Sequence, residues 1–268
     1  MVISMDDVTH KADTLSTGGK TSNGLGLLAV IPARNEAPTI AAVVSGVMSK
    51  LPVLVIDDGS QDETADLARE AGTTVISHGT NRGKGAALLT GFAWALDNGY
   101  DAVVTLDADG QHAAEDLDDM VHAYRAGAGD LIIGERTFSV MPFPRWLSQP
   151  IGAWLMTLAL GVSVTDCQSG FRVLSRRLME RMRLTARGYE MEVEMIWEAV
   201  RLGYSIGWVP IQTIYLPGRR SGFHPLKDTL RFVRMTWHIW RSRRRLQDVQ
   251  ETETVEEDDA CLGPRTIS

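Results

Sequence analysis

Residues 102–112 read AVVTLDADGQH, a β-branched run followed by two aspartates one residue apart. The first four residues are typical of a buried strand. Asp107 and Asp109 would then lie at the carboxyl end of that strand, the edge of an open α/β sheet at which ligands bind. The small residues beside these carboxylates leave room for an oxygen-ligated cation such as Mg²⁺ or Mn²⁺. The same pattern also fits a turn in which an aspartate caps the next helix.

Strands and helices alternate along most of the chain. The expected strands are short apolar runs at residues 27–31, 51–56, 73–77, 101–106, 131–134 and 206–211. One helix is expected to begin near Pro38, and a second after a capping-box spacing at residues 60–63. Three further helices are expected at residues 83–96, 114–126 and 190–201. This alternation predicts an α/β fold with a mostly parallel sheet and helices on both faces.

Four more polar motifs accompany the LDADGQ segment. They are PARNE at residues 32–36, DDGS at 57–60, NRGKG at 81–85 and DCQSGFR at 166–172. In this order the motifs resemble an inverting family 2 glycosyltransferase, and most closely the dolichyl or polyprenyl phosphate mannosyl- and glucosyltransferases. The resemblance covers about residues 27–222. It implies a GT-A-like fold and metal-dependent transfer of a hexose from GDP-mannose or UDP-glucose to a polyprenyl or dolichyl phosphate.

The resemblance also implies which residues bind the nucleotide sugar and the Mg²⁺ or Mn²⁺ cofactor. The donor-binding residues are Pro32, Ala33, Arg34, Glu36, Asp58, Gly83, Lys84, Asp107 and Ala108. The metal ligands are Asp107, Asp109 and Gln111, with His112 as a further candidate. Four positions in these motifs have a structural alternative. Asp57 and Asp58 could cap a turn, Glu36 could be a first-turn carboxylate stabilised by the helix dipole, and Lys84 could be a solvated loop residue.

The catalytic and acceptor residues follow from the same likeness. The catalytic candidates are Asp109, Arg136 and Asp166, and the acceptor-phosphate candidates are Ser169, Arg219 and Arg220. Arginine suits a phosphate because its planar fork donates two parallel hydrogen bonds. A polyprenyl phosphate is already anionic and needs no strong base. A hydroxyl acceptor would need one, from Asp166 or from the glutamates at 190, 192 and 194.

Two segments have the composition of a membrane-facing surface. Residues 138–162 are strongly apolar and interrupted by prolines, and residues 223–248 predict a basic amphipathic helix rich in Trp, Phe and Arg. Such a helix suits an anionic membrane surface, although a core helix with a basic solvent face is an alternative. The sequence contains no run of 18 apolar residues, the length that a bilayer-spanning helix needs. We therefore expect a peripheral protein or a membrane-spanning partner. No nucleic-acid-binding module surrounds the basic helix.

The overall composition fits one globular domain with appendages. The chain has 268 residues, 44% of them hydrophobic and 23% charged, and a net charge of −7. We expect a disordered leader at 1–25, a glycosyltransferase domain at 26–222, the interfacial helix at 223–248 and an acidic disordered tail at 249–268. Two cysteines, one of them in the tail, suit a reducing compartment, and no signal peptide opens the chain. The expected location is the cytoplasmic face of a membrane.

Three alternative functions remain at this point. The same fold could transfer sugar to a soluble or polysaccharide hydroxyl. A sugar nucleotidyltransferase is less well supported, because PARNE stands where that class has a glycine-rich loop. A non-catalytic nucleotide-binding protein is the third alternative, against which the intact Asp107, Asp109 and Arg136 argue.

Overall fold

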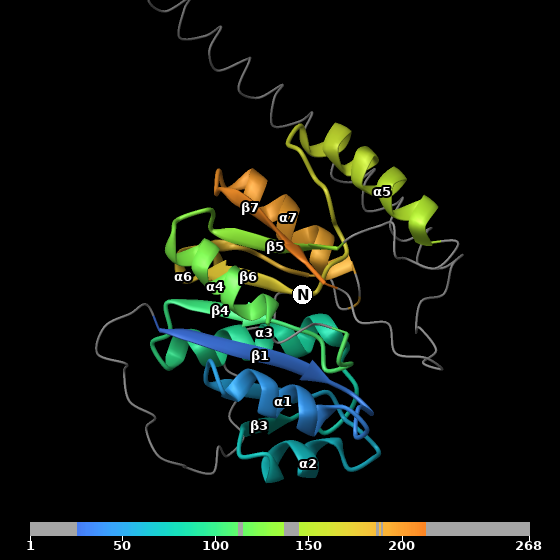
Figure 1. The fold of residues 1–268 in the computed structure, drawn as a ribbon, viewed down its shortest axis with the longest axis vertical. Coiled ribbons are helices and arrows are strands. Elements are labelled where there is room, and N and C mark those ends of the chain that lie inside the picture. The colour runs from blue at the N-terminus through green and yellow to red at the C-terminus, as the bar shows by residue number, and fades with distance from the viewer. Residues whose placement is uncertain (1–25, 112–114, 137–144, 186–187, 189, 213–268) are drawn as a thin grey trace, which may run out of the picture.

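The computed structural model describes residues 26–111, 115–136, 145–185, 188 and 190–212. These residues form a seven-stranded sheet in the order β3-β2-β1-β4-β6-β5-β7 (Figure 1). Only β6 among the seven strands runs antiparallel to its neighbours. The strands are β1 (Leu27–Ala33), β2 (Val53–Asp57), β3 (Thr74–Ser77), β4 (Ala102–Thr105), β5 (Leu131–Arg136), β6 (Arg172–Ser175) and β7 (Ile206–Ile211).

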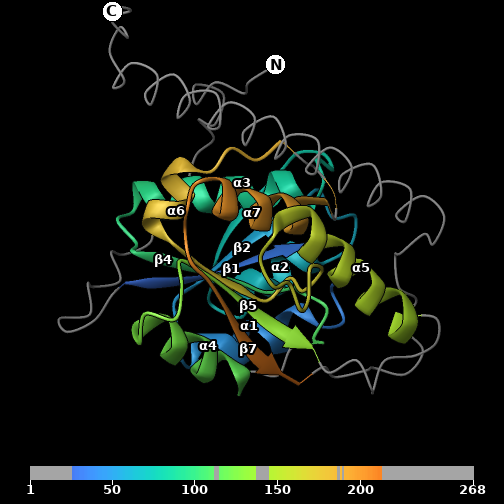
Figure 2. The same cartoon turned by 90° about the horizontal axis from the view of Figure 1, so that it is seen from above.

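Helices cover both faces of this sheet (Figure 2). One face carries α3 (Lys84–Asp97), α5 (Arg145–Leu160), α6 (Arg176–Arg181) and α7 (Glu190–Arg201). The other face carries α1 (Ile40–Met48), α2 (Thr64–Glu70) and α4 (Asp116–Arg125). The predicted fold class, a mostly parallel sheet with helices on both faces, is confirmed for these residues.

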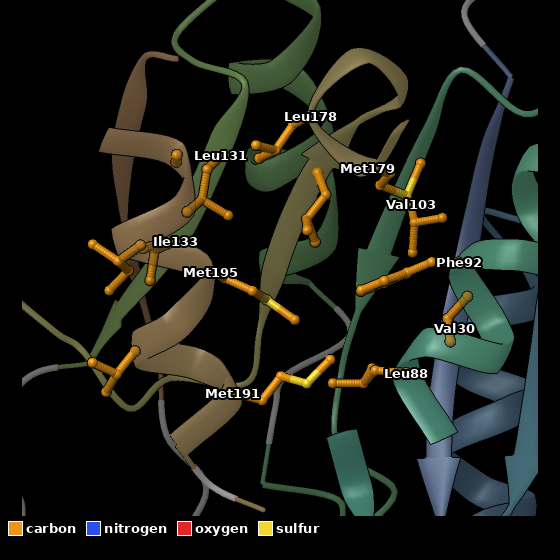
Figure 3. Close-up of a cluster of buried hydrophobic side chains, with 14 of the residues drawn as sticks. Val30, Leu88, Phe92, Val103, Leu131, Ile133, Leu178, Met179, Met191 and Met195 are labelled. Carbon is orange, nitrogen blue, oxygen red and sulfur yellow. The ribbon is translucent and has the colours of Figure 1, made fainter. Parts of the chain in front are cut away.

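The core consists of two apolar layers because alternate residues of each strand point to opposite faces. In β1, Leu28 and Val30 pack under α3, whereas Ala29 and Ile31 pack under α1. Figure 3 shows the first layer, in which Leu88 and Phe92 of α3 lie near methionines of α7. Gly91 brings α3 close to the sheet, since a Cβ there would overlap the side chain of Val30. Burial on both faces explains why the strands are continuous apolar runs rather than alternating ones.

All six expected strands are present, with ends that differ by at most two residues. Three elements were not predicted as such: β6, α6 and the helix α5 within the apolar stretch at 138–162. β6 has only four residues and is preceded by a polar motif, and α6 follows it directly with no intervening loop. The predicted capping box at residues 60–63 is wrong. Ser60 Oγ instead accepts from Asn35 N at 2.9 Å, and α2 begins at Thr64, where Asp62 Oδ1 accepts from the Thr64 N–H at 3.1 Å.

The apolar stretch at 138–162 contains helix α5, which lies at the periphery of the molecule beside α7 (Figures 1 and 2). The expected leader, interfacial helix and acidic tail lie outside the described residues, as do His112, Arg219 and Arg220. Within the described ranges, no helix is both long enough and apolar enough to cross a membrane.

Candidate functional site

The parallel strands end at one edge of the sheet and bring most of the predicted residues together there. β1 ends at the PARNE turn, β2 at Asp57–Asp58, β4 just before Asp107, and β5 at Arg136. β6 is antiparallel, so its first residue, Arg172, lies at the same edge and the preceding SG dipeptide does too. Sheet topology therefore places five polar motifs, which are spread over about half of the chain, around one site.

The centre of this site is an ion-paired triad. Lys84 Nζ lies 2.6 Å from Asp107 Oδ1 and 2.7 Å from Glu192 Oε1. Burial by itself would lower the pKa of the ammonium, but the two carboxylates outweigh that effect and raise the pKa of Lys84 above its ordinary value. Lys84 is therefore a fixed positive charge between Asp107 and Glu192. The alternative of a solvated loop lysine does not describe this side chain.

Gly170 packs directly against this triad. A Cβ on Gly170 would lie 2.6 Å from Asp107 Oδ2 and 2.9 Å from Lys84 Nζ, closer than real contacts allow. The Gly170 carbonyl accepts a hydrogen bond from Thr105 Oγ1 at 2.8 Å, which holds the SG dipeptide against the end of β4. The glycine of the QSGFR motif thus leaves space for the charged groups of the LDAD motif.

The predicted metal ligands form an oxygen-rich turn after β4. Asp107 and Asp109 are partly exposed, and the Gln111 N–H donates to Asp109 Oδ1 at 3.0 Å. The Ala108 carbonyl accepts from Thr39 Oγ1 at 2.8 Å, which fixes the turn against α1. Among the described residues, no group of three or more acidic, histidine or cysteine side chains is arranged to hold a metal. Two carboxylates nevertheless fit Mg²⁺ or Mn²⁺, which commonly retains waters and shares substrate phosphate oxygens.

Asp58 is buried and fully engaged by the protein, with only 3% of its surface exposed. Its Oδ1 accepts from the Arg82 N–H at 2.8 Å, and its Oδ2 accepts from the Gly83 N–H at 2.7 Å. The ring of His78 lies 2.9 Å from the same Oδ1. Asp58 therefore holds the loop that carries Lys84. Asp57 caps its own turn, because its Oδ1 accepts from the Ser60 N–H at 3.1 Å.

The PARNE turn is held in place by the neighbouring 60–64 segment. The Glu36 N–H donates to Thr64 Oγ1 at 2.7 Å, and the Gln61 N–H donates to Asn35 Oδ1 at 2.8 Å. Asn35 has a φ of 54°, a left-handed conformation that asparagine tolerates better than most residues. Arg34 is exposed, and Pro32 and Glu36 are partly exposed at this edge.

Asp166 and Arg136 form a bidentate ion pair at the end of β5. Arg136 Nε lies 2.7 Å from Asp166 Oδ2, and the second guanidinium nitrogen lies 2.9 Å from Oδ1. The N–H groups of Gln168 and Ser169 donate to the same Oδ1 at 3.0 and 3.1 Å. Burial by itself would raise the pKa of Asp166, but the hydrogen bonds and charge of Arg136, with those N–H groups, lower it below its ordinary value. A lowered pKa makes the Asp166 carboxylate a weaker base than an ordinary aspartate.

Arg172 links the DCQSGFR segment (residues 166–172) to α7 by hydrogen bonds. The guanidinium is almost fully buried and donates to the carbonyls of Ser169 at 2.7 Å and Cys167 at 3.2 Å. It also donates to the Glu192 carbonyl, which fixes the start of α7 beside the site. Within the described ranges, three buried side-chain oxygens have neither a hydrogen-bond nor an ion-pair partner: Thr165 Oγ1, the Ser169 hydroxyl and Glu192 Oε2.

Several residues of this edge were not identified from the sequence as site residues. His78, Thr39 and Thr64 follow no motif, and their partners lie up to 69 residues away. Glu192 was one of three glutamates considered as bases. The sequence could not single it out, because Glu192 and Glu194 each stand between two apolar residues of α7 and both are buried.

The sequence model described as Glycosyl transferase family 2 matches residues 28–183, more than half of the chain. This chain belongs to that family. The glycosyltransferase is 36% identical over 201 residues to polyprenol monophosphomannose synthase of Mycolicibacterium smegmatis, covering 69% of this chain and 76% of that protein. It is 33% identical over 201 residues to undecaprenyl-phosphate mannosyltransferase of Micrococcus luteus, covering 69% of this chain and 82% of that protein.

Solved structures show the same fold at lower identity. Glucosyl-3-phosphoglycerate synthase from Mycobacterium tuberculosis, in complex with Mn²⁺, UDP and glucosyl-3-phosphoglycerate, superposes on the glycosyltransferase with a TM-score of 0.62. The two are 22% identical, and the match covers 82% of this chain and 80% of that chain. This similarity confirms the GT-A-like architecture.

Proposed function

We propose that this glycosyltransferase moves a hexose from a nucleotide diphosphate sugar to the phosphate of a polyprenyl lipid, with Mg²⁺ or Mn²⁺ at Asp107 and Asp109. The names of its relatives support the acceptor class: two are synthases or transferases of polyprenyl phosphate sugars. A third, from Methanococcus voltae, is named a dolichyl-phosphate N-acetylglucosaminyltransferase and is 32% identical over 213 residues, covering 69% of this chain and 84% of that protein. The sugar and the base of the donor remain to be assigned by experiment.

The observation that carries the proposal is the state of Asp166. Its carboxylate is ion-paired with Arg136 and accepts two backbone N–H groups, and its pKa is lowered. The residue at the acceptor motif is thus arranged to position a loop, and it is not arranged to remove a proton. An acceptor that is already an anion, such as a lipid phosphate, requires no such base.

The proposed reaction is a single displacement. A phosphate oxygen of the lipid attacks the anomeric carbon of the hexose, and the bond between that carbon and the nucleoside diphosphate breaks on the opposite face. Asp107 and Asp109 would hold a divalent cation, which would supply Lewis-acid neutralisation of the leaving diphosphate. Lys84 adds a fixed positive charge to the same side, and Gly170 leaves room for the Asp107 carboxylate and the Lys84 ammonium to pair. Ser169, with its buried hydroxyl, lies on the acceptor side.

Peripheral membrane binding is part of this proposal. On α5, Trp154 is 59% exposed and Leu158 is 56% exposed, and Val162 just beyond the helix is 37% exposed. Trp154 and Leu158 are four residues apart and share one face of α5, Val162 follows the helix end, and Met156 and Ala159 are buried. The chain then runs from this apolar face into the loop of Asp166 and Ser169. We infer that the face contacts the bilayer from which the lipid acceptor enters, together with the basic segment at 223–248.

One observation favours the alternative of a hydroxyl acceptor. Glu192 Oε2 is buried and has no hydrogen-bond partner in the part of the chain that the structure describes, so it could receive a sugar hydroxyl. The deciding experiment incubates the purified protein with labelled GDP-mannose or UDP-glucose and Mn²⁺. Parallel reactions contain a short polyprenyl phosphate, the matching polyprenol or simple sugars. Label that partitions into organic solvent only with the polyprenyl phosphate supports the proposal. Transfer to the sugars alone contradicts it.

A further inference from the structure

Thr157 lies in the last turn of α5, and its hydroxyl joins this helix to the chain that follows it. Thr157 Oγ1 accepts a hydrogen bond from the Val164 backbone N–H at 3.0 Å. The hydroxyl proton can go to the Ala153 carbonyl at 3.0 Å or to the Val164 carbonyl at 3.3 Å. Because a backbone N–H can only donate, the bond from Val164 to Thr157 keeps its direction whichever carbonyl receives that proton.

This hydrogen bond closes a short loop after the helix. α5 ends at Leu160, and Gly161 has a φ of 70°, a left-handed conformation that turns the chain away from the helix axis. The Gly161 N–H donates to the Thr157 carbonyl at 2.8 Å. Residues 161–163 are exposed, whereas Val164 is 4% exposed and packs in the same apolar layer as Leu160. The Thr157 hydroxyl therefore holds the chain at the point where it returns to the core.

Val164 stands two residues before Asp166, at the start of a tightly packed segment. Asp166 Oδ1 accepts from the Ser169 N–H at 3.1 Å, and the Arg136 guanidinium bonds both carboxylate oxygens. Asp166 and Ser169 are each 0% exposed. Only Thr165 separates Val164 from Asp166, so a shift of Val164 relative to the sheet displaces Asp166 as well.

The same helix turn carries the exposed apolar face of α5. Trp154 lies three residues before Thr157, and Leu158 follows it directly. Both are more than half exposed and belong to the face that we propose contacts the bilayer. Because the backbone hydrogen bonds of a helix keep neighbouring turns in fixed register, a displacement of this face also displaces the Thr157 hydroxyl.

We propose that Thr157 is a positioning residue that couples the placement of α5 to the segment of Asp166 and Ser169. The ligand that benefits is the lipid phosphate proposed as the acceptor, so the inference rests on the proposed function and extends it. Docking of α5 on a bilayer restricts the motion of the helix. The bond between Thr157 and Val164 passes this restriction to Asp166 and Ser169, so the segment is better ordered when the acceptor arrives.

Hydrogen exchange of two backbone amides measures the coupling without any assay of activity. The Val164 amide reports the bond to Thr157, and the Ser169 amide reports the bond to Asp166. Thr157→Val replaces the hydroxyl by a methyl group of similar size. It should accelerate exchange at both amides by about fivefold, the equivalent of one ordinary hydrogen bond. Thr157→Ser keeps the hydroxyl and should restore protection at both.

Thr165→Val is the matched control for the valine variant. It makes the same chemical change in the same segment, but the Thr165 hydroxyl has no hydrogen-bond partner in the part of the chain that the structure describes. We expect this control to leave the exchange of the Val164 and Ser169 amides unchanged.

Steady-state kinetics distinguish a positioning role from a general loss of stability. Rates are measured with Mn²⁺, a short polyprenyl phosphate and whichever of GDP-mannose and UDP-glucose is turned over. Thr157→Val should raise KM for the polyprenyl phosphate by about fivefold and leave KM for the nucleotide sugar unchanged. Partial unfolding would lower the amount of active enzyme, but it would not change the ratio of the two KM values.

Vesicles of phosphatidylglycerol test the transmission from the membrane. In the wild type, vesicle binding should slow exchange of the Ser169 amide. Thr157→Val should still bind the vesicles, because its exposed apolar face is intact, but its Ser169 amide should gain no protection. Trp154→Glu should gain none because its binding is weakened.

The outcomes separate this inference from the proposed function. If the wild type transfers no sugar to the polyprenyl phosphate, or binds no vesicles, that part of the proposed function fails. The exchange rates of Val164 and Ser169 without vesicles still decide the role of Thr157.

Three results would overturn the coupling. Thr157→Val could accelerate exchange at Val164 alone, which would make Thr157 a local cap of α5. It could fold and keep the wild-type KM for the polyprenyl phosphate. Vesicles could bind to the wild type and leave Ser169 exchange unchanged. Should the valine variant not fold, Thr157→Ala, which removes the same hydroxyl and favours a helix more than valine, is measured in the same way.

Discussion

Replacing Gly170 by alanine is the most specific perturbation of the site. The added Cβ would lie 2.6 Å from Asp107 Oδ2, 2.9 Å from Asp107 Oδ1 and 2.9 Å from Lys84 Nζ. An ordinary carbon–oxygen contact is about 3.3 Å or more, so the Asp107 carboxylate must retreat by about 0.7 Å. The backbone at Gly170 cannot easily yield instead, because its carbonyl is bonded to Thr105.

The expected loss follows from that displacement. Displacing a catalytic group by about 1 Å from its reactive position can lower the rate by about a hundredfold. A shift of about 0.7 Å in both the predicted metal ligand and the Lys84 ammonium should therefore lower kcat/KM for the donor by several tens of fold, about 50-fold. Gly170 does not have a positive φ, so alanine fits its backbone, and stability should change by no more than about 1 kcal/mol.

The assay measures donor turnover across a Mn²⁺ titration, with thermal melting of each variant. Gly79→Ala is the matched control, since a Cβ at Gly79 meets nothing within 4 Å. We expect the control to retain its activity and Gly170→Ala to lose activity while melting normally. Full activity of Gly170→Ala with an unchanged Mn²⁺ requirement would show that Asp107 and Lys84 do not lie at the reaction centre.

Three further predictions test other parts of the site. Asp107→Asn and Asp109→Asn should each lower turnover by about a hundredfold with folding intact, because the leaving diphosphate loses its counter-charge; normal turnover after removal of divalent cations would refute this. Asp166→Asn should cost about 3 kcal/mol of stability at neutral pH, since it breaks a buried pair. Because the folded pKa of Asp166 is lowered, this stabilisation is present above the unfolded pKa of about 3.9 and lost as the pH falls through the lower folded value. The folded fraction of Asp166→Asn should lose less activity than Asp109→Asn and keep the wild-type shape of the pH–rate profile. If the wild-type profile shows an essential base that titrates near neutrality, and Asp166→Asn abolishes that feature, a hydroxyl acceptor is favoured instead. Co-sedimentation should show binding to anionic but not to zwitterionic vesicles, with less binding at high salt or in Trp154→Glu and more after deletion of residues 251–268. Equal failure with both vesicle types, with and without that tail, would contradict membrane docking.

The alternation of apolar runs and polar turns was enough to predict the sheet and its helices. The central strands β1, β2 and β4 are short apolar runs buried almost throughout, a local signal that does not depend on their neighbours. β6 escaped prediction because its four residues begin with a buried arginine, and the guanidinium of Arg172 donates to the carbonyl of Glu192, 20 residues away in α7. The spacing of Ser60 suggested a helix cap, but in the folded chain the Ser60 hydroxyl oxygen accepts a hydrogen bond from the Asn35 N–H.

The sequence by itself determined which chemistry the site contains: two carboxylates after a strand, a lysine between glycines, and an acceptor motif with an arginine upstream. Tertiary structure decided how those groups are used. Asp58 holds a loop, Asp166 is neutralised by Arg136, and Lys84 bridges Asp107 and Glu192. A side chain's role depends on which partners the sheet register brings within hydrogen-bonding distance. Those partners lie 20 to 108 residues away in the chain, so no local pattern specifies them.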